Sequence, residues 1–267
     1  MCRMRNEKRL LECGNGCRPQ EQENAMTQKQ QIENHWELSG KRLVVLGGSS
    51  GIGLAVAQQA VAQGATAIIA SSNADRVKQA VATIDGKVEG HALDLSNERD
   101  IQKFFQKIGD FDHLVFTAGD TLQLNELAAT DLTKARHAFE LRYWAALAAV
   151  KYASPHIRTD GSIVLTTGVA GRRPHKGWAV VASICGTIEA LTRALAVELA
   201  PIRVNAVCPG VVRTSLWKNM QGAGSGGHVR ERGQSFARGP GRRSLRDCAR
   251  LSFPHAGGIQ HGPNRRS

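Results

Sequence analysis

The 267-residue chain contains few aromatic residues (5%), and it lacks an apolar run near the roughly 18 residues that a membrane-spanning helix needs. Its first twenty residues lack the apolar core of a secretory signal. Its six cysteines show no metal-ligand spacing, so we expect no metal site and reduced thiols. These absences favour a soluble, cytoplasmic protein with no membrane partner.

Lysine is missing from the C-terminal segment, residues 220–267, and acids are scarce there. This segment holds nine arginines, ten glycines and two acids, and it contributes +7 of the net charge of +12. It has no strand-like run and no long amphipathic helix, so its composition predicts disorder. The preceding residues carry an ordinary charge, and the basic tail has few aromatic residues. We therefore expect no nucleic-acid partner.

The change in composition near Met220 leaves two interpretations open. A shifted reading frame would explain why lysine and apolar periodicity end together, and a natural Arg/Gly-rich interaction tail is the competing explanation. A frame shift would leave the last strand as an open sheet edge, so we would expect poor solubility and weak or no activity. At the other end, residues 1–37 are polar and predict a flexible extension, in which Met26 is an alternative start.

Between these ends, residues 38–219 alternate between strand-like and helix-like patterns. Strands are predicted at 41–47, 65–71, 87–95, 111–119, 161–168 and 202–210. The first is a short apolar run that ends in glycine, the pattern of a strand buried on both faces. Helical patterns follow at 51–64, 73–85, 97–109, 131–156 and 178–199. Strict alternation implies right-handed crossovers and a parallel sheet covered on both faces. We therefore predict a single α/β domain of the Rossmann type, a doubly wound sheet in three layers.

The segment "LGGSSGIG" joins the first strand to the first helix and predicts a dinucleotide site. Gly47 permits the turn, Gly51 lets the backbone approach a phosphate, and Gly53 lets the helix pack on the strand. The helix N-terminus then offers free N–H groups and a positive dipole end to a pyrophosphate. The predicted contacts are Gly47, Ser49, Ser50, Gly51, Ile52 and Gly53.

The end of the second strand reads "ASSNAD" and predicts which nicotinamide cofactor binds. An acid there would bond the ribose 2′-OH and select NAD, but Ser71, Ser72 and Asn73 take its place. Small hydroxyls at a helix start, Ser72 above all, can accept a 2′-phosphate, which favours NADP. NAD stays possible because no arginine stands at this point.

The segments "GGSSGIG", "DL" at 94–95, "TAG" at 117–119, "GSIVLTTGVAG" and "ALTRALAVELAPIRVNAVCPGVVRT" occur in a fixed order. Together they resemble the short-chain dehydrogenase/reductase family over residues 38–219. The resemblance implies an NAD(P)-dependent oxidoreductase acting on a carbonyl or alcohol of a small molecule. It implies cofactor contacts from Asp94 to the adenine ring and from Val211 and Thr214 to the nicotinamide carboxamide. Further cofactor contacts are implied at Ala118, Gly119, Pro209 and Gly210.

The chain departs from this family at its catalytic pair. Family members carry a Tyr-x-x-x-Lys motif, in which the tyrosine transfers the proton and the lysine lowers its pKa. Alignment on "ASICGTIEALTRALA" puts Val180 and Ile184 at these positions, and a slip of one residue gives no Tyr–Lys pair either. Thr167 stands 13 residues earlier, where the family has a serine. Arg142 stands where the family has an asparagine.

Three residues are candidates for replacing that chemistry. Arg142 could polarise a carbonyl, Thr167 could add a hydrogen bond, and His175 could supply a proton. Two of them have a plainer alternative: Arg142 pairs with a carboxylate or binds an anion, and His175 is a solvated loop residue. Trp178, in the same segment, is interpreted as a packing residue. The leading hypothesis is a divergent oxidoreductase, and the alternative is a non-catalytic nucleotide-binding or regulatory protein.

The resemblance also implies a homodimer or homotetramer, because family members usually associate through two long helices. The corresponding segments here, 131–156 and 178–199, are rich in alanine, which permits close approach of two helices. The competing interpretation is that these alanines only pack on the sheet.

Overall fold

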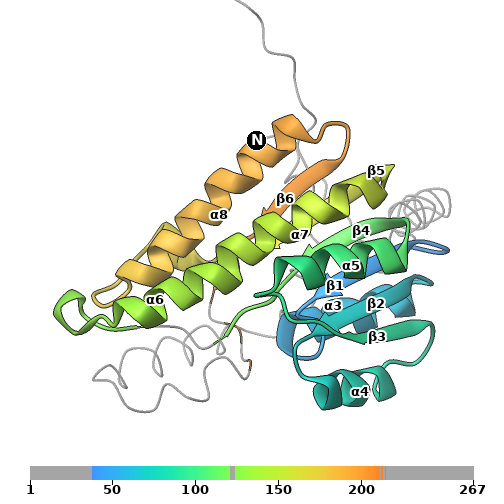
Figure 1. Cartoon of the computed structure of the whole chain (residues 1–267), viewed down its shortest axis with the longest axis horizontal. Coiled ribbons are helices and arrows are strands. Elements are labelled where there is room, and N and C mark those ends of the chain that lie inside the picture. Colours follow the sequence, from blue (N-terminus) through green and yellow to red (C-terminus); the bar gives the residue numbers. More distant parts are fainter. Residues whose placement is uncertain (1–37, 121–123, 211, 213, 215–267) are drawn as a thin grey trace, which may run out of the picture. The chain divides into compact units, whose positions relative to one another are not determined.

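The structure is a computed structural model, and it describes residues 38–120, 124–210, 212 and 214 (Figure 1). All six predicted strands are present and form one parallel sheet with the order β3-β2-β1-β4-β5-β6. The strands are β1 (Arg42–Leu46), β2 (Thr66–Ser71), β3 (Val88–Ala92), β4 (Phe111–Phe116), β5 (Ile157–Thr166) and β6 (Arg203–Val207). The predicted doubly wound α/β fold is therefore confirmed.

Helices connect the strands where the periodicity predicted them. They are α3 (Gly51–Ala62), α4 (Ala74–Ala82), α5 (Glu98–Ile108), α6 (Leu132–Phe139), α7 (Ala145–Ala153) and α8 (Ala179–Glu198). Short 3₁₀ turns are η1 (Leu127–Ala129), η3 (Ser154–His156) and η4 (Val169–Gly171). The long helix expected over 131–156 is interrupted by a π-helical turn, η2 (Glu140–Trp144), so it consists of α6, η2 and α7 in succession.

The order in which strands are added across the sheet reverses between β1 and β4, which are parallel neighbours in the middle of the sheet. From β1 the chain winds outward through β2 to β3, and from β4 it winds the other way through β5 to β6. The last residues of the two central strands, Leu46 and Phe116, lie opposite each other. In doubly wound sheets, ligands bind in the crevice beyond the carboxyl ends of the strands at such a reversal.

Two apolar cores cover the two faces of the sheet. Val44 and Leu46 face the core formed with α5, α7 and α8, whereas Leu43 and Val45 face the core formed with α3 and α4. Figure 1 shows α5, α7 and α8 together over one face. Because both faces are buried, the central strands read as continuous apolar runs rather than as alternating ones.

Helix α8 is, by length and composition, the one described helix that could cross a membrane, with a mean hydropathy of 1.6 over its most apolar window. The expectation that no such segment exists was therefore too strong. In the structure α8 packs against β5, β6 and η4, and Ile184, Ile188 and Leu195 are buried. Packing on the sheet buries 33% of that apolar window.

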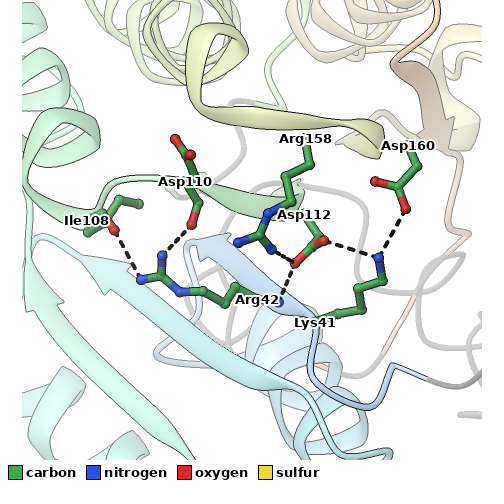
Figure 2. A network of polar contacts seen from close by, with 7 residues as sticks. All are labelled: Lys41, Arg42, Ile108, Asp110, Asp112, Arg158 and Asp160. Carbon is green, nitrogen blue, oxygen red and sulfur yellow. Dashed lines mark hydrogen bonds and ion pairs between the residues drawn. The ribbon is translucent and has the colours of Figure 1, made fainter.

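A network of charged residues joins the three strands β1, β4 and β5 at their amino ends (Figure 2). Asp112 of β4 is 1% exposed and accepts three hydrogen bonds. The donors are the main-chain N–H of Arg42 (2.8 Å), Nη1 of Arg158 (2.9 Å) and Nζ of Lys41 (3.2 Å). Burial alone would raise the pKa of Asp112, but these three donors hold the pKa below its ordinary value.

Candidate functional site

The glycine loop between β1 and α3 is packed so tightly that two of its positions exclude a side chain. A Cβ atom at Gly47, where φ is +86°, would lie 2.6 Å from the main-chain nitrogen of Ala118. A Cβ atom at Gly53 would lie 2.4 Å from both the carbonyl oxygen of Gly47 and Oγ1 of Thr117. The loop therefore lies directly against the end of β4, at the reversal point of the sheet.

The N-terminus of α3 has the features of an anion site. The N-cap residue Ser50 makes no side-chain capping hydrogen bond, and the first turn contains no acid. Because the first N–H groups of a helix have no partner within it, they and the helix dipole attract an anion such as a pyrophosphate. The structure also brings Thr214 beside this turn, since a Cβ at Gly51 would lie 3.4 Å from the Thr214 methyl group.

The predicted adenosine end of the site lies beyond β2 and β3. Ser72 is exposed between β2 and α4, and Asn73 caps α4 by accepting the N–H of Arg76 at 2.8 Å. The N–H and hydroxyl of Ser96 both donate to Oδ1 of Asp94, at 2.9 and 2.7 Å, and these bonds lower the pKa of Asp94. Asp94 is thus ionised near neutral pH, and no described residue donates to its Oδ2 atom.

A pocket opens beside the glycine loop at the carboxyl ends of β4 and β5. Its empty volume is about 820 Å³, open solvent at its mouth included. Arg142 is the only charged residue among the described residues that line it. The lining residues are Phe116, Thr117, Ala118, Leu124, Arg142, Thr166, Thr167, Gly168, Val169, Ala170, Trp178, Val181, Ile184, Cys185, Pro209 and Gly210. The pocket is therefore a largely apolar cavity with one cation in its wall.

The π-helical turn η2 carries Arg142 into this wall, and π-turns of this kind are frequent at functional sites. The Arg142 side chain is 19% exposed, and burial lowers its pKa, which the nearby Asp120 carboxylate opposes. Nη2 of Arg142 donates to the main-chain oxygen of Asp120. The Asp120 carboxylate is 3.9 Å from Nε, which is too far for a hydrogen bond. The guanidinium thus remains charged with most of its donors unused by described residues.

Thr167 lies in the pocket wall, but its hydroxyl proton is already used. Thr167 is buried and its Oγ1 donates to the main-chain oxygen of Cys185 at 3.0 Å. The predicted hydrogen bond from Thr167 to a substrate carbonyl would require this bond to break.

On α8, the residues that face the pocket are Val181, Ile184 and Cys185, whereas Val180 does not line it. The i, i+4 pair that faces the cavity is therefore Val181 and Cys185, one residue later than the pair aligned from the sequence. Burial raises the pKa of the Cys185 thiol. Spacing in the sequence cannot decide between two pairs that differ by one residue, because packing of the helix on the sheet decides which of its faces meets the pocket.

The segment directly before α8 holds two residues singled out from the sequence, His175 and Trp178, and they differ in their relation to the pocket. His175 is exposed and is not part of the pocket lining, and its ring meets that of Trp178 edge to face at a centroid distance of 4.7 Å. Trp178 packs against the buried cluster of Ala170, Val181 and Cys185, as its packing interpretation predicted, and it also lines the pocket. Asp120, the partner of Arg142, was missed, although its position directly after the "TAG" segment was a usable signal.

Two further predictions meet the limits of the described chain. Pro209 and Gly210 line the pocket, and their contact with a cofactor stays a prediction. Val211 lies outside the described residues, as do residues 1–37 and 220–267. Within the described part of the chain, no group of three or more His, Cys, Asp or Glu side chains could hold a metal ion.

Comparison with known proteins assigns the family. A model described as an SDR-like Rossmann domain matches residues 35–234. The short-chain dehydrogenase/reductase ATR9 of Stachybotrys chlorohalonatus is 38% identical over 197 residues, covering 67% of this chain and 77% of that protein.

Solved structures agree with this match. A small-chain dehydrogenase in complex with NADPH is 32% identical with a TM-score of 0.61, over 76% of this chain and 83% of that one. NAD⁺-bound xylitol dehydrogenase is 25% identical with a TM-score of 0.63, over 65% and 71% of the two chains. With its glycine loop and pocket at the reversal point of a parallel sheet, the chain belongs to the short-chain dehydrogenase/reductase family of NAD(P)-dependent oxidoreductases.

Proposed function

We propose that this protein transfers hydride between NADP and a carbonyl or alcohol group of a small molecule held in the Arg142 pocket. The observation that carries the proposal is the position of this pocket. Its wall includes Ala118 and the Pro209–Gly210 turn, which border the expected nicotinamide position, and it holds a single fixed cation.

The residues present fit a nicotinamide dinucleotide. The glycine loop and the uncapped start of α3 would hold the pyrophosphate, Asp94 would accept from the adenine amino group, and Thr214 would lie near the nicotinamide end. The bound cofactor would supply or accept the hydride, and the protein has to bind, orient and exclude water.

The chain's own contribution is electrostatic. The Arg142 guanidinium, desolvated in an apolar wall, would polarise the carbonyl oxygen and stabilise negative charge that develops on it. Trp178, Val181 and Ile184 would exclude water from the reacting carbon. Thr167 would serve as a structural hydrogen-bond donor to Cys185 and not as a proton donor to the substrate.

The preference for NADP over NAD rests on the end of β2. Ser71, Ser72 and Asn73 leave the end of β2 without a carboxylate that would repel a 2′-phosphate. The first turn of α4 then holds both an exposed acid, Asp75, and the exposed Arg76. Among the solved relatives one binds NADPH and another NAD⁺, so both cofactors occur in this fold.

Calorimetric titration with NADPH and NADH tests the cofactor, and consumption of NADPH over a panel of carbonyl compounds tests the chemistry. We expect the tighter binding for NADPH. A Ser72→Asp variant should invert that preference, because a carboxylate would repel the 2′-phosphate and accept from the ribose hydroxyl. Absence of binding for both cofactors at millimolar concentration would refute the proposal. Binding without turnover over a wide panel would favour the non-catalytic alternative, which the comparisons do not favour.

We also propose a homo-oligomer formed through the alanine-rich helices α7 and α8. Trp144, the last residue of η2 directly before α7, and Val197, near the end of α8, are exposed apolar side chains. Light scattering coupled to size exclusion would give the mass, and a monomer at micromolar concentration would contradict the proposal. The cytoplasmic location stays a prediction from the sequence.

A further inference from the structure

The N–H donors of Arg142 outnumber the acceptors that the described residues offer them. A guanidinium has five N–H groups in a planar fork. Only one of them makes a hydrogen bond to a described residue, the main-chain oxygen of Asp120. The Asp120 carboxylate lies 3.9 Å from Nε, and its Oδ1 atom is buried without a hydrogen bond. The guanidinium is 19% exposed and lies in the wall of the pocket, so an oxygen ligand bound there can accept from these donors.

The same wall offers no proton to such a ligand. Among the described lining residues, Thr117 and Thr167 direct their hydroxyl protons to main-chain oxygens, and so does Thr166, which donates to Phe116 at 2.9 Å. The Cys185 thiol is buried, and burial raises its pKa, so it releases its proton less readily than a free thiol. The described wall can therefore hold a negative oxygen but has no acid ready to neutralise it.

From this combination we propose that the substrate is an α,β-unsaturated carbonyl compound, whose carbonyl oxygen becomes an enolate held by Arg142. The proposal rests on the proposed function, because it needs hydride from the nicotinamide cofactor. It keeps the cofactor, the pocket and the carbonyl oxygen held by Arg142, but the hydride adds to the β-carbon of a conjugated C=C bond. Reduction at the β-carbon and reduction at the carbonyl carbon are therefore alternative outcomes that one product analysis distinguishes.

The atoms and electrons balance without an acid from the protein. Hydride, which is one proton with two electrons, forms a C–H bond at the β-carbon. The C=C pair then forms a new double bond to the carbonyl carbon, and the C=O π pair moves onto oxygen as the enolate. Water from the open mouth of the pocket donates a proton to the α-carbon and leaves hydroxide, so the net reaction consumes one NADPH and one proton and yields the saturated carbonyl compound and NADP⁺.

An enolate suits this wall better than the alkoxide of a simple ketone reduction. An alkoxide carries its whole charge on one strongly basic oxygen, which requires a proton at once. An enolate shares its charge with carbon and can persist as an ion pair, for which the planar Arg fork is a strong partner. Stabilisation of a developing oxyanion by preorganised donors is commonly among the largest contributions to catalysis.

The direct test is a binding experiment with a stable analogue of an enolate. 4-Nitrophenolate carries a delocalised oxyanion, and its absorbance distinguishes it from neutral 4-nitrophenol. We expect the protein with NADP⁺ to bind the phenolate at least about tenfold more tightly than the neutral 4-nitroanisole, as charge-assisted hydrogen bonds imply. Arg142→Gln should abolish this preference, and Arg142→Lys should keep part of it. The control Arg172→Gln removes an arginine that is 69% exposed and paired with Glu189, and it should change nothing.

Three outcomes would overturn the inference. The first is equal binding of phenolate and anisole, and the second is a preference that survives Arg142→Gln. The third is tighter binding of 4-nitrobenzoate than of the phenolate, which would identify a carboxylate site instead. A turnover arm compares 2-cyclohexenone with cyclohexanone, and an allylic alcohol as the product of the enone would also overturn it. NADP⁺ binding is titrated separately, so failure of the proposed function is recognised independently of these results.

Discussion

A buried carboxylate lies at one end of the central strands and a partly buried guanidinium at the other, and their hydrogen bonding differs. At the amino ends, the Asp112 carboxylate is 1% exposed and receives three hydrogen bonds from residues of β5 and of the start of β1. At the carboxyl ends, the Arg142 guanidinium is 19% exposed and makes one hydrogen bond to a described residue. The satisfied charge fastens strands together, whereas the unsatisfied one retains donors for a ligand.

This difference follows from what each end of the sheet has to do. The Asp112 network connects β4 to residues 46 and 70 positions away along the chain, so it fixes how the strands align. A network with all its members satisfied rigidifies the structure, while a partly satisfied one costs free energy of folding and persists where function needs it. In this parallel sheet, the network that stabilises the fold lies at the amino ends of the central strands, and the pocket lies at their carboxyl ends.

The largest effect should come from Arg142→Gln, which keeps the size and hydrogen-bonding capacity but removes the charge. We expect kcat for NADPH-dependent reduction to fall by about 10²–10³-fold, the range measured for removal of one oxyanion donor in other enzymes. Steady-state kinetics and NADPH titration measure this. Unchanged cofactor affinity together with an unchanged melting temperature would locate the effect in the chemistry, and an unchanged kcat would exclude Arg142 from it.

At the opposite end, Asp112→Ala should mainly affect the free energy of unfolding. The substitution leaves the N–H of Arg42 and the charge of Arg158 without their acceptor, so we expect a loss of about 2–4 kcal/mol. Urea unfolding followed by circular dichroism measures it. Asp160→Ala is the control, because Asp160 is exposed and bonds only Lys41, and we expect no measurable change from it. Equal losses in both variants would remove the distinction between the two carboxylates.

The sequence predicted the strands and helices well, for a reason that lies in the sheet. Both faces are buried, so each central strand is an apolar run bounded by polar or glycine residues, and the helices between them show clear periodicity. The glycine loop was predictable as well, because positions such as Gly53 tolerate no side chain at all. In both cases the signal is local to a few neighbouring residues.

The chemistry of the pocket was less predictable, because it depends on contacts between distant residues. The bond from Thr167 to Cys185 spans 18 positions, and nothing in the spacing indicates that the Thr167 proton is used. The choice between Val180 and Val181 at the pocket depends on the rotation of α8 about its axis. The partner of Arg142, Asp120, lies 22 positions away on another loop.

Acid should weaken the Asp112 network in a defined window of pH. The pKa of Asp112 is lower in the folded than in the unfolded state, so its contribution to stability is complete above the unfolded pKa of about 4. This contribution is lost as the pH falls through the folded pKa. The difference in melting temperature between the wild type and Asp112→Asn should therefore be constant from about pH 7 to pH 5 and shrink below about pH 4. A difference that grows toward low pH would contradict the assignment.

A smaller effect should follow from Gly119→Ala, which tests the position of Arg142 without removing its charge. The added Cβ would lie 2.5 Å from Nη1 of Arg142, so the guanidinium has to move away from the place it now occupies. Because a misplaced group loses much of its effect on a transition state, we expect kcat to fall by about tenfold. A matched control is Gly186→Ala on the exposed side of α8, where a Cβ meets nothing within 4 Å. Equal kcat values for the two variants would show that the present position of Arg142 is unimportant.

The smallest effect should come from His175→Ala, which tests whether a residue outside the pocket lining contributes to the reaction. His175 is exposed and outside the lining, and its described ring contact is the edge-to-face packing on Trp178. Loss of this contact should loosen the Trp178 indole slightly, which would raise KM by less than about threefold and leave kcat unchanged. His175→Phe keeps an aromatic ring but cannot carry a proton, so it should restore KM. If both variants instead lower kcat together and flatten its pH profile, then His175 supplies the proton, and the pocket has an acid at its mouth that its wall does not provide.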